Sequence, residues 1–131
     1  MFDDDGRATI GIVRDRILIV DDHAPFRSAA RALLTEEGFQ IVGEAADGRA
    51  ALDAARLLRP DIVLLDINLP DLDGFEVARR LAEAAEDDGD SPAIVLISSR
   101  AASAARIARS AARGFIPKDE LCGSAVARLV G

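Results

Sequence analysis

The chain has 131 residues, half of them hydrophobic and 30% charged, which suits one globular domain and excludes intrinsic disorder. One cysteine excludes a disulfide framework, and a net charge of −7 disfavours direct contact with DNA or RNA, since no basic surface would attract phosphates. The acidic start is unlike a signal peptide and no apolar run nears the roughly 18 residues of a membrane span, so we expect a cytoplasmic domain that binds no membrane.

Five short apolar runs have the length of β-strands. Three of them are apolar at nearly every position, which is typical of parallel strands that helices cover on both faces. These three are Ile17–Val20, Ile62–Leu65 and Ile94–Ile97, and two weaker runs lie at Phe39–Val42 and Phe115–Pro117. Residues 1–15 are weakly periodic, so we expect an N-terminal extension there and a single domain over residues 16–131.

Apolar residues at helical spacing fill the intervals between these runs. In chain order, the predicted helices run from Pro25 to Gly38, from Asp47 to the residue before Pro60, from Asp73 through Leu81, over residues 101–112, and from Asp119 to Val130. Two of the starts depend on acidic residues: Asp73-x-x-Glu76 resembles a capping box, and Asp119 would cap the last helix.

Strand and helix alternate five times, which predicts an α/β domain with a parallel sheet. Five strands and five helices suit a doubly wound sheet of strand order 2-1-3-4-5. Such sheets bind ligands beyond the carboxyl ends of the strands, at the switch point beside strands 1 and 3. The residues that follow the strands are therefore the candidates for a functional site.

Acidic residues follow the two strands that flank the switch point. Asp21 and Asp22 follow the first strand, and Asp66 follows the third. Three converging carboxylates repel one another and raise one another's pKa values, so a cation must offset their charge. Mg²⁺ prefers oxygen ligands of this kind. Ser98 and Lys118 follow the fourth and fifth strands and would lie at the same edge of the sheet.

This arrangement predicts a carboxylate that accepts a phosphoryl group. Mg²⁺ held by the three aspartates would neutralise the phosphoryl oxygens, while Lys118 and Ser98 contact other oxygens of the group. Asp66 is the best acceptor, because it ends the central strand within reach of the other residues. Of the 16 basic residues 15 are arginine, so the lone Lys118 points to a task that arginine does not perform.

Each of these residues also has a plain structural explanation. Asp22 could cap the helix that starts near Pro25, Asp66 could belong to an ordinary turn, and Lys118 could be a surface residue. The joint placement of candidate residues at four strand ends favours the functional hypothesis.

Four segments carry the residues at these strand ends. They are Ile17-Leu-Ile-Val-Asp-Asp-His23, Asp61-Ile-Val-Leu-Leu-Asp-Ile-Asn-Leu-Pro-Asp-Leu-Asp-Gly74, Ile94-Val-Leu-Ile-Ser-Ser99 and Gly114-Phe-Ile-Pro-Lys118. In this order they closely resemble the receiver domain of bacterial two-component response regulators, over about residues 15–131. The resemblance implies a flavodoxin-like fold and Mg²⁺-dependent transfer of a phosphoryl group from the phosphohistidine of a histidine kinase.

Carried over by motif, the resemblance implies a role for each acidic residue. Asp66 would be the phosphoacceptor. Asp21 and Asp22 would be the acid pair that binds the metal, with Asp22 the more direct ligand. The backbone carbonyl of Asn68 would complete the protein's share of the metal ligands.

The resemblance also implies a switch and partners. Ser98 and Lys118 would contact the phosphoryl group, and Phe115 would be the aromatic residue that rotates with the state of the switch. The implied partners are a histidine kinase or phosphotransfer protein and an unidentified downstream protein. A homodimer that forms on phosphorylation is left open.

The sequence departs from the family pattern in several places. Asp119 follows Lys118 where many receivers have proline, as in the subgroup that usually carries a helix-turn-helix output domain. No output domain or linker is present in these 131 residues, so we expect a receiver that stands alone or was excised from a longer regulator. The interval from Ser98 to Lys118 is shorter than usual, which predicts a short or distorted fourth helix. The surface expected from the fourth helix, the fifth strand and the fifth helix is rich in Ala and Arg and has few apolar residues to anchor a partner. The mode of dimerisation is therefore left open.

Three other functions fit parts of the sequence. A pseudo-receiver would act as an interaction module without phosphorylation, although every chemical residue is intact. A haloacid dehalogenase-like phosphatase needs a second acid two positions after the first, where this chain has Asn68. A calcium loop at Asp71–Gly74 would need further acidic ligands, and Pro70 breaks its pattern. We therefore expect a phosphoacceptor that assists its own phosphorylation and dephosphorylation, and not a turnover enzyme.

Overall fold

The computed structural model describes residues 15–88 and 91–130. The expected N-terminal extension lies outside the described residues except for Asp15, so that domain boundary stays a prediction. Within the described part of the chain, no helix is long and apolar enough to cross a membrane.

Five parallel strands form one sheet in the order β2-β1-β3-β4-β5, which confirms the predicted topology. The strands are β1 (Arg16–Val20), β2 (Gln40–Ala45), β3 (Ile62–Asp66), β4 (Ala93–Ser98) and β5 (Gly114–Pro117). Each predicted run lies within one of these strands or overlaps it. The order reverses between β1 and β3, so their carboxyl ends lie at the switch point of the sheet.

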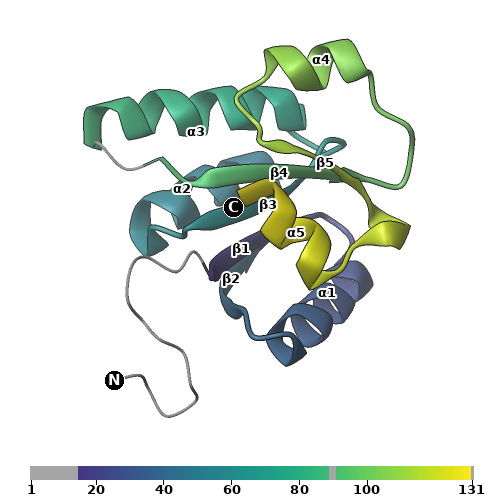
Figure 1. The fold of residues 1–131 in the computed structure, drawn as a ribbon. Coiled ribbons are helices and arrows are strands. Elements are labelled where there is room, and N and C mark those ends of the chain that lie inside the picture. The colour runs from purple at the N-terminus through teal and green to yellow at the C-terminus, as the bar shows by residue number, and fades with distance from the viewer. Residues whose placement is uncertain (1–14, 89–90, 131) are drawn as a thin grey trace.

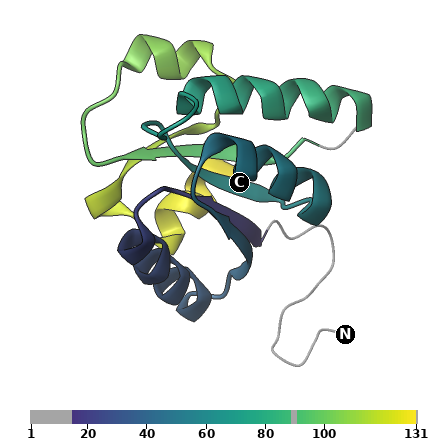
Figure 2. The ribbon, with the colours of Figure 1, turned by 180° about the vertical axis from the view of Figure 1, so that it is seen from behind.

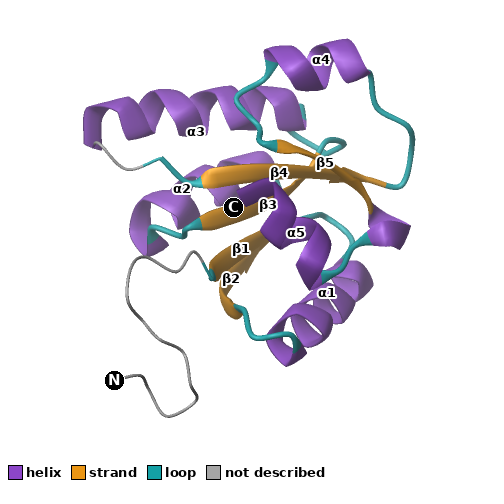
Figure 3. Ribbon diagram, in the orientation of Figure 1, coloured by secondary structure: helices purple, strands orange, loops and turns teal. Residues whose placement is uncertain are grey.

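In the part of the chain that the structure describes, five α-helices cover the two faces of the sheet. They are α1 (Ala24–Glu36), α2 (Gly48–Leu58), α3 (Gly74–Asp88), α4 (Ala104–Arg109) and α5 (Gly123–Val130). Helices α1 and α5 pack on one face, and α2, α3 and α4 lie on the other, as the two opposite views show (Figures 1 and 2). Figure 3 shows the resulting layers, with the strands between the helices.

Alternation within each strand divides the core into two layers. Ile17 and Ile19 of β1 pack with α1 and α5, whereas Leu18 and Val20 pack with α2 and α3. All four side chains are fully buried, as are most residues of β3 and β4. Burial on both faces explains why the central strands are continuous apolar runs and not alternating ones.

The ends of α2 follow the expected local chemistry. The Asp47 carboxylate accepts a hydrogen bond from Ala50 N at 2.8 Å and caps the start of the helix. The helix ends at Arg59, which adopts a left-handed conformation with φ of 48°, directly before Pro60. Both ends were predicted from the sequence.

The capping box predicted at Asp73 forms only in part. The Asp73 carboxylate accepts a hydrogen bond from Phe75 N at 2.7 Å, but the Glu76 carboxylate pairs with Arg79 and Arg80. The two guanidinium groups attract the carboxylate more strongly than a backbone N–H does, and they hold the pKa of Glu76 at about 2.

The prediction that Asp119 caps the last helix is wrong. Asp119 lies in a short 3-10 turn, Lys118–Glu120, and α5 begins at Gly123. The cap comes from across the fold, because the Glu37 carboxylate just beyond α1 accepts a hydrogen bond from Gly123 N at 2.5 Å. A Cβ atom at position 123 would lie 2.5 Å from that Glu37 oxygen, so a side chain there would displace the capping carboxylate.

Helix α4 has six residues, which confirms the expected short fourth helix. The Ser103 hydroxyl accepts a hydrogen bond from Arg106 N at 3.2 Å and begins the helix. The Ser110 hydroxyl donates to Ile107 O at 2.7 Å and ends it. The two serines therefore confine the helix to fewer than two turns.

Candidate functional site

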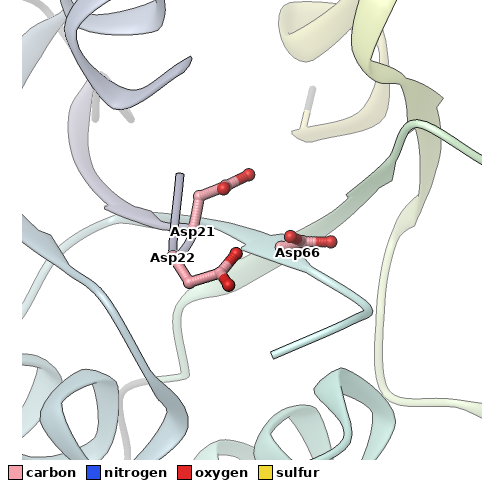
Figure 4. Close-up of side chains that lie close together, drawn as sticks. All are labelled: Asp21, Asp22 and Asp66. Atoms are coloured by element: carbon pink, nitrogen blue, oxygen red, sulfur yellow. The ribbon is translucent and has the colours of Figure 1, made fainter. Parts of the chain in front are cut away.

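The three predicted acidic residues meet at the carboxyl edge of the sheet. Asp21 and Asp22 directly follow β1, and Asp66 is the last residue of β3. One carboxylate oxygen from each lies within 4.8 Å of the other two. Figure 4 shows the Asp22 side chain extending toward the side where Asp66 lies, with Asp21 beside it.

Hydrogen bonds distinguish these carboxylates from helix caps. The residue that precedes α1 is His23, and its side chain makes no capping hydrogen bond. The Asp21 carboxylate accepts a hydrogen bond from His23 N at 2.8 Å. Among the described residues Asp22 caps nothing and is exposed, so the capping explanation considered for Asp22 is wrong.

Asp66 is buried among groups that shift its pKa in opposite directions. The residue is 4% exposed, and burial raises the pKa of its carboxyl group, with a further increase from the nearby Asp21 carboxylate. Two groups oppose this rise: Asn68 N donates to Asp66 Oδ1 at 3.0 Å, and the Lys118 ammonium group lies 3.4 Å from Oδ2. The rise in pKa prevails, so an ionised Asp66 is held at a cost in stability.

Lys118 is a residue of this cluster and not a surface lysine. Its Nζ lies 2.5 Å from Asp21 Oδ2 and 3.4 Å from Asp66 Oδ2. Burial alone would lower the pKa of Lys118, but the carboxylates of Asp21 and Asp66 outweigh it and raise that pKa. The ammonium group therefore stays charged and neutralises part of the acidic cluster.

The oxygen-rich cluster suits a hard divalent cation. Asp21 Oδ2 is fully buried, and the Lys118 ammonium group lies 2.5 Å from it as an ion-pair partner. Such an oxygen retains a lone pair for a metal. Three carboxylate oxygens within 4.8 Å of one another match the ligands that Mg²⁺ prefers, so the cluster fits the magnesium site of a receiver domain.

Ser98 ends β4 at the same edge of the sheet and is buried. Its hydroxyl oxygen accepts hydrogen bonds from Arg100 N at 3.0 Å and from the Asn68 side-chain amide at 3.3 Å. Asn68 thus joins Asp66 to Ser98, because its backbone N–H donates to Asp66 while its side chain donates to Ser98. The sequence placed Ser98 at the site but did not predict this role of the Asn68 side chain.

Phe115 lies in β5 beside Leu96 of β4. Its ring is partly buried and packs against the core layer that contains α2 and α3, together with Ile107 of α4. The ring therefore lies on the same face of the sheet as the short α4.

The loop that follows β3 is held by its own acidic residues. The Asp71 carboxylate accepts hydrogen bonds from Gly48 N at 2.7 Å and Arg49 N at 3.0 Å, and these backbone N–H groups lower the pKa of Asp71. The Asp73 carboxylate caps α3 and pairs with Arg106 of α4. Both carboxylates serve the fold, which disfavours the calcium loop considered from the sequence.

Sequence reasoning missed one neighbour of Lys118. Phe26, in the first turn of α1, presents its ring to the lysine, with Nζ 4.6 Å from the ring centroid. The sequence assigned Phe26 to the apolar stripe of the helix, and it does pack against the core there. Helical periodicity gives no sign of the second contact, which depends on where β5 brings Lys118.

A groove of about 460 Å³ lies between α3 and α4, apart from the acidic cluster. Phe75, Arg79 and Arg106 are among the residues that line it. Both arginines are paired with acidic residues, Arg79 with Glu76 and Glu83 and Arg106 with Asp73. The groove contributes none of the residues expected at the site.

The chain is similar in sequence to known receiver domains and regulators. Residues 17–127 match the family model of the response regulator receiver domain. A Pseudomonas aeruginosa protein described as a transcriptional regulator is 42% identical over 106 residues, which are 80% of this chain and 50% of that protein. The Bordetella pertussis protein described as the virulence-factor transcription regulator BvgA is 38% identical over 108 residues, 81% of this chain and 50% of that protein. This chain spans about half the length of both relatives.

A solved structure shows the same fold. The signal receiver domain of the Mycobacterium tuberculosis protein described as the response regulator NarL superposes with a TM-score of 0.73 at 32% sequence identity. The match covers 90% of this chain and 98% of that domain. The likeness therefore extends over nearly the whole described fold.

Proposed function

This chain belongs to the response regulator receiver domain family, and from that premise we propose that it accepts a phosphoryl group on Asp66 with Mg²⁺ bound and switches conformation in response. The observation that carries the proposal is the meeting of Asp21, Asp22 and Asp66 within 4.8 Å, beside the one lysine of the chain. The donor is a phosphohistidine of a histidine kinase or of a phosphotransfer protein.

In the proposed reaction a carboxylate oxygen of Asp66 attacks the phosphorus atom of the donor. An O–P bond forms, the N–P bond of the phosphohistidine breaks, and the donor imidazole leaves with the electron pair. Asp21, Asp22, Asp66 and the backbone carbonyl of Asn68 would hold Mg²⁺. When bound, this cation would neutralise the charge of the phosphoryl oxygens. Burial that raises the pKa of Asp66 also withholds water from its carboxylate, which favours its reaction with the donor.

Lys118 and Ser98 would stabilise the phosphoryl group once it is on Asp66. The Lys118 ammonium group already lies 3.4 Å from Asp66 Oδ2, with three N–H donors. The two hydrogen bonds at Ser98 use its oxygen as an acceptor, so its own O–H is available to donate to a phosphoryl oxygen. Both residues thus supply hydrogen-bond donors where negative charge increases.

The switch would couple Ser98 to Phe115. A phosphoryl group on Asp66 attracts the Ser98 hydroxyl, and the space that Ser98 leaves admits the Phe115 ring. The change is a shift between two packings of one fold. Phe115 has no hydroxyl, so its outward position has no polar anchor, and we expect the inward position to be well populated without phosphate. NMR spectra with a beryllofluoride phosphate mimic should show a change at the Phe115 ring, and an unchanged ring would contradict the coupling.

Two other functions are less well supported. A haloacid dehalogenase-like phosphatase needs a general acid two residues after Asp66, and there the Asn68 amide donates to Ser98 and holds no acidic proton. A pseudo-receiver needs no intact acidic cluster, yet this chain has one. We therefore infer a phosphoacceptor that assists its own phosphorylation and dephosphorylation, without steady turnover of other substrates.

The proposal also includes the partners and the location. The phosphorylated state would be read by a downstream protein, and a homodimer formed on phosphorylation is left open as a further partner. The cytoplasmic location expected from the sequence is part of the proposal. The two curated relatives are described as transcriptional regulators, and the match covers 50% of each, so transcriptional regulation is an activity of those proteins.

Mass spectrometry after incubation with a histidine kinase phosphodonor or a small phosphoryl donor tests the proposal. With Mg²⁺, the wild-type protein should gain one phosphoryl group that is labile to base, and chelation of Mg²⁺ should prevent the gain. The Asp66→Asn variant should gain none, whereas Asp53→Asn, which removes an exposed carboxylate of α2, should behave as wild type. Labelling that persists in Asp66→Asn would contradict the assignment, and steady hydrolysis of phosphomonoesters would favour the phosphatase.

A further inference from the structure

Lys118 has three neighbours of different chemistry. Its Nζ lies 2.5 Å from Asp21 Oδ2, 3.4 Å from Asp66 Oδ2, and 4.6 Å from the centroid of the Phe26 ring. The lysine side chain is 18% exposed, so most of it is covered by protein. A cation this close to an aromatic ring is attracted by the negative face of the ring.

The two carboxylates that pair with Lys118 also have other roles in the proposed site. Asp21 is its nearest partner and is also one of the three residues suited to hold a divalent cation. Asp66 is the residue that would change charge and shape on phosphorylation. In the proposed reaction, both carboxylates that pair with Lys118 would therefore also interact with another group, Asp21 with the cation and Asp66 with the phosphoryl group.

The Phe26 ring differs from both, because it is neutral and is not a metal ligand. It attracts the ammonium group without a hydrogen bond, which leaves the three N–H donors of Lys118 for oxygen acceptors. The ring lies in the first turn of α1 and is partly buried against the core layer of α1 and α5, which restricts its position. It therefore offers a less mobile contact to the flexible four-carbon side chain of Lys118.

We propose that Phe26 is a positioning residue for Lys118: its ring holds the ammonium group over the acidic cluster, so that the lysine stays next to Asp66 whatever binds Asp21. The proposal deepens the proposed function, since it assigns to α1 a part in phosphoryl transfer. Phe26 would touch neither the phosphoryl group nor the cation.

The lone lysine makes a direct test possible. Protein labelled with ¹³C at lysine alone gives the side-chain signals of one residue, Lys118. Protons above an aromatic face resonate upfield, so the ε-methylene protons of Lys118 should be shifted upfield from those of a free lysine, and their carbon should show restricted motion. In Phe26→Leu, which keeps an apolar side chain without the ring, both features should be lost. Phe26→Tyr keeps a ring and should retain them.

A matched control separates positioning from packing. Phe39 packs against the same core layer as Phe26, whereas the ring that faces the Lys118 ammonium group is that of Phe26. Phe39→Leu should therefore lower the melting temperature as Phe26→Leu does, while leaving the lysine signal as in wild type. A lysine signal that is unchanged in Phe26→Leu, or equally changed in Phe39→Leu, would overturn the proposal.

The same variants test the consequence for the reaction. The phosphorylation rate of Phe26→Leu should be about three- to tenfold below wild type, the effect of losing one cation–π contact, and Phe26→Tyr should restore most of it. A wild-type rate in Phe26→Leu despite a mobile lysine would show that the contact has no positioning role. If wild-type protein itself accepted no phosphoryl group, the proposed function would fail, while the lysine spectra would still decide whether Phe26 holds Lys118.

Discussion

The Lys118 ammonium group lies nearer to Asp21 than to Asp66, 2.5 Å against 3.4 Å, although β1 and β5 are not neighbours in the sheet. Strands β3 and β4 separate them, so the lysine side chain reaches along the carboxyl edge of the sheet. Asp21 is fully buried and fixed at the end of β1, and it draws Lys118 toward the centre of the site. The pair therefore brings the single lysine of the chain to the proposed phosphoacceptor.

Replacement of Lys118 by arginine should impair the reaction while preserving the charge. A guanidinium group is planar and bulkier than the ammonium group, so it would not occupy the same space between Asp21 and Asp66. We expect Lys118→Arg to lower the phosphorylation rate at least about tenfold, with a melting temperature and Mg²⁺ affinity close to wild type. The exposed Arg128 of α5, exchanged for lysine, is the control and should leave the rate unchanged. Wild-type phosphorylation and switching in Lys118→Arg would remove Lys118 from the site.

Magnesium should stabilise the protein through the acidic cluster. A ligand that binds the folded state raises its stability by mass action, about 1.4 kcal/mol at ten times the dissociation constant. Melting temperatures should therefore rise with millimolar Mg²⁺ in wild type. Among the described residues the exposed Asp22 makes no hydrogen bond, so Asp22→Asn should melt no lower than wild type without metal but lose most of the rise. An Mg²⁺ response that is equal in Asp22→Asn and wild type would be incompatible with this site.

The charge of Asp66 should destabilise the metal-free protein at neutral pH. The folded state raises the pKa of this carboxyl group, so folding favours its protonated form, and stability falls as pH rises through the folded pKa. Without metal, Asp66→Asn should thus melt a few degrees above wild type at pH 7. The difference should shrink as pH falls through the folded pKa and vanish below about 4, the ordinary pKa of aspartate, because Asp66 is then protonated in both the folded and the unfolded state. Melting temperatures of wild type and Asp66→Asn, measured in chelator across this pH range, test the direction of the effect. A difference in melting temperature that grew at low pH would contradict the prediction.

Gly74 should be intolerant of any side chain, because it packs against the backbone of the phosphoacceptor. A Cβ atom at position 74 would lie 2.5 Å from the Asp66 carbonyl oxygen and 2.6 Å from Ile67 Cα. Neither is the end of a flexible side chain, so the loop after β3 would have to move. We expect Gly74→Ala to cost about 2–3 kcal/mol in the free energy of unfolding, measured with urea, and to slow phosphorylation.

Gly38 provides the contrast for Gly74. Its φ is +103° and an added Cβ atom would meet nothing within 4 Å, so Gly38→Ala strains the backbone without displacing a neighbour. It should cost about 1 kcal/mol and leave the phosphorylation rate at the wild-type value. A Gly74→Ala variant as stable and as active as wild type would show that the loop adapts to the added atom.

Much of the fold could be predicted because its signals are local. The continuous apolar runs predicted β1, β3 and β4, and the intervening helical spacing predicted a parallel sheet that proves to have the expected order. Asp47 and Pro60 correctly marked the two ends of α2. The prediction failed where a local capping pattern had a distant competitor, as at Asp119, whose place as cap is taken by Glu37 from the far end of α1.

The sequence by itself determined which residues end the strands, and hence that Asp21, Asp22 and Asp66 would share one edge of the sheet. Strand order follows from hydrophobic period and chain connectivity, which are properties of neighbouring residues. Tertiary structure alone decided the contacts among side chains from separate elements. Lys118 could have paired with any of the acidic residues, and its place between Asp21 and Phe26 depends on how α1 and β5 pack against the sheet. Those contacts depend on distances of a few ångströms across the fold, and no pattern along the chain encodes them.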